Sequence, residues 1–134
     1  ILRRSGADIA EVKKLFQNDL EDTIAKYSII QNAHLYREHI AVAVSAKPVG
    51  RVIAAQAADE LLNIIGIDAS FVLAPDGDTV NISARSMGDV NVQVVLEALG
   101  GGGNAAAAGG QVTGKSIEDV ARELMQAIDQ YLEG

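Results

Sequence analysis

The chain has 134 residues, a length typical of one domain, and apolar and charged residues make up 49% and 22% of it, as in ordinary globular proteins. Its net charge of -7 disfavours a general nucleic-acid binder, because such proteins use Lys and Arg to displace counterions from a polyanion. An anionic ligand would have to be held locally, in a small pocket rather than a long groove.

Cysteine is absent, which excludes disulfides, thiolate nucleophiles and cysteine-based zinc sites. No apolar run approaches the ~20 residues of a membrane-spanning helix, and no signal peptide is recognisable, so a cytoplasmic domain is expected. The chain begins at Ile1 rather than at methionine, and in the middle of a pattern. We therefore expect functional parts upstream.

The first predicted element is a long helix over residues 8–33. Asp8 and Glu11 resemble a capping pair at its start. Apolar residues recur at every third or fourth position, the helical period; they are Ile9, Val12, Phe16, Leu20, Ile24, Tyr27 and Ile30. One apolar stripe on a polar helix predicts packing along one side, so this helix is a candidate connector to another domain.

The central segments predict a strand, a helix and a hairpin. Residues 39–46 form a β-branched apolar stretch typical of a buried strand. Residues 51–65 predict a helix that ends at Gly66; its expected inward residues are Val52, Ile53, Ala57, Leu61, Leu62 and Ile65. Strands over 69–74 and 79–86 then flank the turn sequence Pro-Asp-Gly-Asp, which predicts an antiparallel pair.

The last third predicts a helix over 89–99, a break at Gly100–Gly103 and a short strand over 111–114. Ser116 and Asp119 form a capping box for the closing helix. A hairpin beside crossover helices indicates an α/β fold, a mixed β-sheet covered by helices, preceded by the long N-terminal connector helix.

The strand over 79–86 carries the first candidate site. Because strand side chains alternate faces, Asn81, Ser83 and Arg85 share one face. Arg presents a planar fork of donors that can bind phosphate oxygens in pairs. The simpler interpretation is a strand with one face in water.

The second candidate is the run Gly100–Gly103 followed by Asn104. Glycines allow positive φ, so successive amides can converge on an anion, although a flexible helix end also favours glycine. The spacing fits neither the dinucleotide fingerprint nor the P-loop, and the P-loop lysine is missing. A metal site is not expected, because His34 and His39 lack carboxylate neighbours.

Taken together, these residues resemble the DHH-associated domain, the C-terminal lobe of the DHH phosphoesterases, whose Gly-Gly-Gly-His signature lies between a helix and a short strand. The similarity is closest to the bacterial GdpP-like cyclic di-AMP phosphodiesterases. It is carried by Leu2–Ala7, by Asn81–Ser86, and by Asn91–Gly103 with Gln111 beyond.

The resemblance implies a division of labour. An upstream Asp-His-His lobe would hold two metal ions, usually manganese, and activate water, whereas this chain, with no metal and no catalytic residue of its own, would bind the nucleotide and be inactive alone. Residues 1–33 would be the connector and 34–134 the substrate-binding domain. The implied substrate-binding residues are Ser83, Arg85, Gly101, Gly102, Gly103 and Asn104.

Asn104 departs from the family signature, which has histidine there. Histidine can carry a charge or shift a proton, whereas asparagine can only hydrogen-bond, so the substitution, natural or introduced, puts full activity of the parent protein in question.

Two alternatives stay open: a lobe for short RNA or single-stranded DNA, as in the nanoRNase and exonuclease relatives, or a decayed regulatory module without ligand. The implied partners are a cyclic or short linear dinucleotide and the upstream DHH lobe, with no long nucleic acid and a possible homodimer of the parent. The parent would be membrane-anchored, with this domain on the cytoplasmic side.

Overall fold

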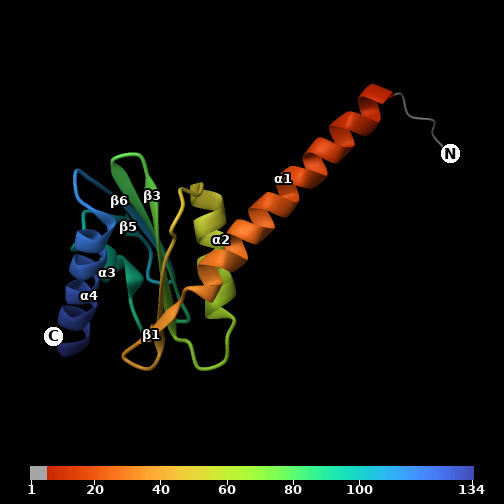
Figure 1. The fold of residues 1–134 in the computed structure, drawn as a ribbon. Helices are drawn as coiled ribbons and strands as arrows, with labels where there is room; N and C mark the ends of the chain where they lie inside the picture. The colour runs from red at the N-terminus through yellow and green to blue at the C-terminus, as the bar shows by residue number, and fades with distance from the viewer. Residues whose placement is uncertain (1–5) are drawn as a thin grey trace.

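The computed structural model describes residues 6–134 and consists of a six-stranded sheet between two helical layers (Figure 1). The first part of Leu2–Ala7 lies outside this range, and the side chains of Ile9, Val12 and Phe16 lie outside the described set. The elements are α1 Gly6–Gln31, β1 His34–Tyr36, β2 Ile40–Val44, α2 Arg51–Leu62, β3 Ala69–Asp76, β4 Thr79–Ser86, α3 Val92–Glu97, β5 Gly102–Gly103, β6 Ala107–Thr113 and α4 Ile117–Glu133.

The sheet has the order β1-β2-β3-β4-β6-β5. β2 and β3 are parallel, joined by the crossover helix α2, and the other neighbours are antiparallel. The predicted mixed α/β fold is therefore confirmed. None of the helices within residues 6–134 is long and apolar enough to cross a membrane.

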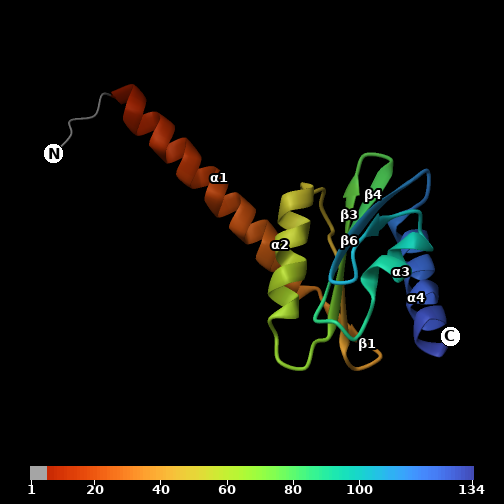
Figure 2. The same cartoon turned by 180° about the vertical axis from the view of Figure 1, so that it is seen from behind.

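Each face of the sheet has its own core. On one face, α3 and α4 pack over large side chains that include Phe71, Leu73 and Ile82. On the other face, α2 and the C-terminal end of α1 pack over smaller ones, among them Ala43 and Val72. Figure 2 shows the two helical layers on opposite sides of the sheet.

The inward side of α2 is made mostly of alanines, with the predicted Leu61 buried at its C-terminal end. Ala54, Ala57 and Ala58 are fully buried, and the buried Ser70 hydroxyl donates a 2.7 Å hydrogen bond to the Ala58 carbonyl. Small side chains let the helix axis come close to β3 and β4. The alanines also explain why two inward assignments were wrong: Val52 is 67% and Ile65 100% exposed, because the alanines set the phase of the helix and α2 ends at Leu62.

Helix α1 projects from the body of the domain (Figure 1). Ile29, near its C-terminal end, is buried against α2 and β2, whereas Leu20, Ile24 and Tyr27 of the predicted stripe are exposed. The apolar stripe is thus largely uncovered by the described part of this chain, and the role of α1 as a connector stays a prediction.

Two strands were not expected. β1 forms a hairpin with β2 across Arg37 and Glu38, both with positive φ. Its Tyr36 hydroxyl donates to the Asp129 carboxylate of α4 at 2.7 Å, and that hydrogen bond is the main cause of the raised pKa of Tyr36. The other strand is β5, which consists of two glycines of the predicted break.

We expect Ala58→Leu to lower the free energy of unfolding by about 1–3 kcal/mol, because the larger side chain has no room between α2 and β3 and must displace the helix. Gln56→Leu is the matched control, since Gln56 is exposed on the same helix, and it should change stability by less than about 0.5 kcal/mol. Urea unfolding followed by circular dichroism measures both. Equal effects would contradict the close approach of α2.

Candidate functional site

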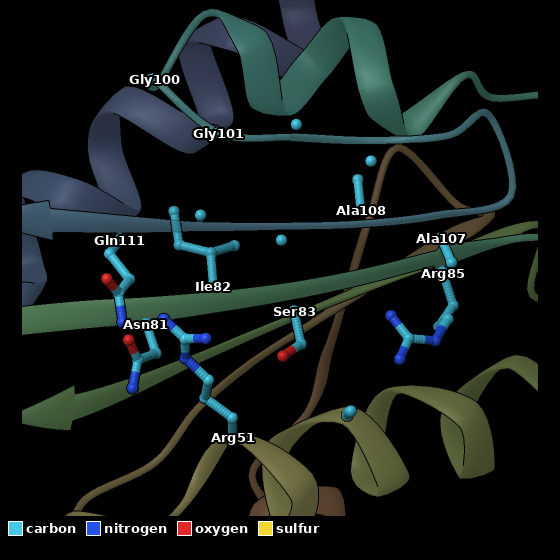
Figure 3. Close-up of a pocket in the computed structure, with 15 residues that line it drawn as sticks. Arg51, Asn81, Ile82, Ser83, Arg85, Gly100, Gly101, Ala107, Ala108 and Gln111 are labelled. Atoms are coloured by element: carbon cyan, nitrogen blue, oxygen red, sulfur yellow. The ribbon is translucent and has the colours of Figure 1, made fainter.

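A hollow of about 690 Å³ opens on the α2 face of the sheet, at the side where α2 no longer covers the strands (Figure 3). α2 lies over β3 and β4, while β6 and β5 continue the sheet beyond it. The lining comes from α2, β4, β6 and the segment after α3; it consists of Arg51, Ala55, Asn81, Ile82, Ser83, Arg85, Gly100–Gly103 and residues 107–111.

The pleat of β4 divides its side chains as the sequence predicted. Val80, Ile82 and Ala84 belong to the core under α3 and α4, whereas Asn81, Ser83 and Arg85 line the hollow. Asn81 and Ser83 are only 4% and 8% exposed. The polar face is therefore buried beside α2 rather than open to water, which rules out the simpler interpretation for these two residues.

Register across three strands arranges the floor of the hollow in rows. Arg85 pairs with Ala107, Ser83 with Gly109, and Asn81 with Gln111, while Gly109 also pairs with Gly102 of β5. Directly paired residues project from the same face of a sheet. The row of paired residues that starts at Ser83 thus continues with Gly109 and Gly102, which have no side chain and leave the backbone uncovered.

Arg85 reaches from β4 toward α2. Its Nε donates to the Asp59 carboxylate at 2.9 Å and its Nη1 donates to its neighbour's carbonyl, that of Ala84, at 2.8 Å. A guanidinium has five N–H donors, so several remain for a ligand. Asp59, which the sequence analysis missed, orients the fork and offsets part of its charge; a lone acidic residue on an exposed helix side gives no signal of such a role.

Arg51 is a second cation of the hollow that the sequence analysis did not identify. It is the first residue of α2, is exposed, and forms no ion pair with any described residue. Figure 3 shows its guanidinium beside Asn81 and Gln111 at one end of the hollow, with Ser83 and Arg85 farther along β4. Arg51 reaches the hollow only because α2 crosses over the sheet, and no spacing of residues in the sequence indicates this position.

The glycine segment serves the hollow differently from the expected nest of amides. Gly100 ends α3 with φ of 84°, and the amides of Gly100 and Gly101 donate to the carbonyls of Glu97 and Leu96 at 3.1 and 2.8 Å. These amides are occupied, so the prediction of a run of free donors is wrong for Gly101.

Close packing against β6 requires glycine at positions 101 and 103, but it does not require glycine at position 102. A Cβ on Gly101 would lie 2.5 Å from the Gly109 carbonyl oxygen, and one on Gly103 would collide with the backbone of β6. A Cβ on Gly102, in contrast, would meet no atom within 4 Å. Because Gly102 pairs with Gly109, and Gly109 with Ser83, that Cβ would enter the hollow on the same row of the floor as Ser83, beyond Gly109.

Asn104 lies at the turn between β5 and β6, next to the hollow but not in its lining. Its side-chain Oδ1 accepts hydrogen bonds of 2.9 Å from the backbone amides of both Ala106 and Ala107. The backbone amide of Asn104 donates to the Ala107 carbonyl at 2.8 Å. The side chain therefore closes the turn, and its role toward a ligand stays a prediction.

Within residues 6–134, excepting the side chains of the first part of α1, no group of three or more His, Asp or Glu side chains could hold a metal ion. The described residues do not fit a manganese centre, and no metal-dependent step is assigned to them.

Comparison with known proteins places these features in a family. Residues 37–134 match the family model of the DHHA1 domain. The chain is 41% identical to the cyclic-di-AMP phosphodiesterase GdpP of Bacillus subtilis and 39% identical to the cyclic-di-AMP phosphodiesterase PdeA of Listeria monocytogenes, in each case over 99% of this chain and 21% of the relative. The chain thus spans about a fifth of the curated relatives it matches.

Solved structures share the fold. An exopolyphosphatase-related protein from Bacteroides fragilis superposes with a TM-score of 0.71 at 20% identity, covering 82% of this chain and 34% of that one. A pGpG-specific phosphodiesterase from Vibrio cholerae gives a TM-score of 0.58 at 16% identity, covering 96% and 47%. At these identities the likeness concerns the fold alone, and the family match decides the assignment: the chain belongs to the DHHA1 domain family.

Proposed function

We propose that this chain is the nucleotide-binding lobe of a metal-dependent phosphodiesterase that hydrolyses cyclic di-AMP. The observation that carries the proposal is the meeting of Ser83, Arg85 and the glycine segment in one hollow, within a DHHA1 domain whose curated relatives include cyclic di-AMP phosphodiesterases.

The charge distribution supports a small anionic ligand. The chain carries a net charge of -7, yet the described lining of the hollow contains two arginines and no carboxylate. Guanidinium–phosphate hydrogen bonds are strong because they are charge-assisted and can form in pairs. A phosphate is thus attracted at this place while the rest of the surface disfavours a long polyanion.

The size and the lining favour a dinucleotide over a long strand. A volume of about 690 Å³ lies within the ~300–1,000 Å³ of ordinary small-ligand sites. Channels for single strands combine a basic groove with aromatic platforms on which bases stack. No aromatic side chain lines the described hollow.

The reaction itself would take place against a second lobe. Two manganese ions, held by a preceding DHH lobe and not by the described residues, would supply the activation of water and the polarisation of the phosphodiester. Arg85 and Ser83 hold the phosphate and sugar, and the bare floor at Gly102 and Gly109 lets the nucleotide lie against the backbone. The 134-residue chain alone would bind without hydrolysing. The parent protein would be anchored in the membrane, with this domain on the cytoplasmic side.

We expect the chain to bind cyclic di-AMP weakly and Arg85→Ala to weaken binding by about 30-fold or more, since losing a charge-assisted contact costs on the order of 2 kcal/mol. NMR titration of the backbone amides of Gly101–Asn104 measures this. Arg122→Ala is the matched control, because Arg122 is an exposed arginine of α4 paired with Asp119. If the amide signals of these glycines do not shift at millimolar ligand while other amide signals do, the ligand binds elsewhere and the assigned site is wrong.

Two glycine substitutions separate folding from binding. Gly101→Ala should lower the free energy of unfolding by about 1–3 kcal/mol, because its methyl group meets the backbone of β6. Gly102→Ala should leave stability within about 0.5 kcal/mol of the wild type but weaken cyclic di-AMP binding, since its methyl group enters the hollow on the row of Gly109 and Ser83. Thermal unfolding and the same titration measure the two effects. Unchanged affinity in Gly102→Ala would show that the ligand does not lie on this floor.

A further inference from the structure

Asn81 is a buried polar residue that the fold does not use. The residue is 4% exposed, and its Oδ1 is the one fully buried side-chain polar atom without a hydrogen-bond partner among the described residues. Buried polar groups almost always find a partner, and leaving one unpaired costs stability. Such an acceptor in the lining of a hollow indicates that a ligand supplies the missing donor.

A second carboxamide lies beside it. Gln111 of β6 pairs directly with Asn81 across the strands, so the two side chains leave the same face. Figure 3 shows Gln111, Asn81 and the Arg51 guanidinium gathered at one end of the hollow. Besides the Arg51 cation, this end presents two neutral carboxamides that both donate and accept, and the rest of the described lining has none.

The distance along β4 suits one nucleotide. Asn81 is two residues from Ser83 and four from Arg85, which corresponds to roughly 7 and 13 Å at about 3.3 Å per residue. A nucleotide whose phosphate lies at Ser83 and Arg85 therefore brings its base toward Asn81. Arg51, whose guanidinium lies beside Asn81 in Figure 3, is exposed and has no ion pair with any described residue, so its side chain can move aside for a ligand.

We propose that Asn81, supported by Gln111, recognises the base of the bound nucleotide and selects adenine. A carboxamide offers one acceptor next to one donor, and adenine offers the complement, the N6 amino donor next to the N7 acceptor. On the same edge guanine and hypoxanthine present two acceptors, N7 and O6, so a carboxamide bound there makes only one of its two hydrogen bonds. The proposal rests on the nucleotide-binding function proposed above.

The test compares three probes: cyclic di-AMP, cyclic di-GMP and cyclic di-IMP, in which a 6-oxo group replaces the amino group. The wild-type chain should prefer cyclic di-AMP over the other two by about tenfold. Asn81→Leu should bind cyclic di-AMP about tenfold more weakly and lose the preference, while its melting temperature stays equal or rises, because the unpaired buried acceptor is gone.

Gln111→Leu and Arg85→Ala complete the set. Gln111 is exposed, so its substitution tests base recognition without disturbing the core, and it should reduce the preference in the same direction. Arg85→Ala should weaken the three probes alike and leave their ratio unchanged, because a phosphate contact carries no base information.

The outcomes distinguish the two proposals. If the wild type binds none of the probes at millimolar concentration and Arg85→Ala has no effect, the nucleotide-binding function fails, and base recognition fails with it. If the wild type binds and Arg85→Ala weakens binding, but Asn81→Leu and Gln111→Leu leave the preference unaltered, the function stands and base recognition by these carboxamides is overturned.

Discussion

The register of β4 is the constraint on which the candidate site depends. Because the side-chain period of a strand is two, a slip by one residue would exchange its two faces. Val80, Ile82 and Ala84 fill the core under α3 and α4, and that burial fixes which residues remain for the hollow. The burial of the apolar side chains of β4 thereby determines that its polar side chains face the hollow. The pairing with β6 then sets Gln111 beside Asn81 and Gly109 beside Ser83.

Helix α2 then determines how deep the hollow is and what charge it has. Its buried alanines bring it close to β3 and β4, so that Asp59 and Arg85 can meet at 2.9 Å. The Asp59 side chain is well exposed, and exposed ion pairs contribute little to stability. Its main effect is therefore to orient the guanidinium. Arg51, at the start of the same helix, has no such counter-charge among the described residues, which leaves the two ends of the hollow electrostatically unequal.

Sequence patterns correctly predicted the features that depend on neighbouring residues in the chain. The β4 range and the opposition of Asn81, Ser83 and Arg85 to the core followed from strict alternation, and α4 followed from its capping box. The patterns failed where distant packing decides. The inward side of α2 consists mostly of alanines, which carry a weak apolar signal, so Leu61 was placed correctly but Val52 on the wrong side. Arg51 and Asp59 join the hollow only through the crossover, and the amides of Gly100 and Gly101 are consumed in ending α3.

The segment over residues 100–110 resembles a flexible, low-complexity loop in the sequence, yet it supplies β5, the first part of β6 and part of the floor of the hollow. Its small side chains have separate causes: Gly101 and Gly103 permit close contact with β6, Gly102 leaves the floor bare, and Asn104 closes the turn with two hydrogen bonds, a use of asparagine that turns favour. The described lining therefore contains arginines and neutral groups but no histidine. Histidine is the side chain that ordinarily changes charge between about pH 5 and 8, so the described lining contains no side chain of the kind that most often transfers protons near neutral pH.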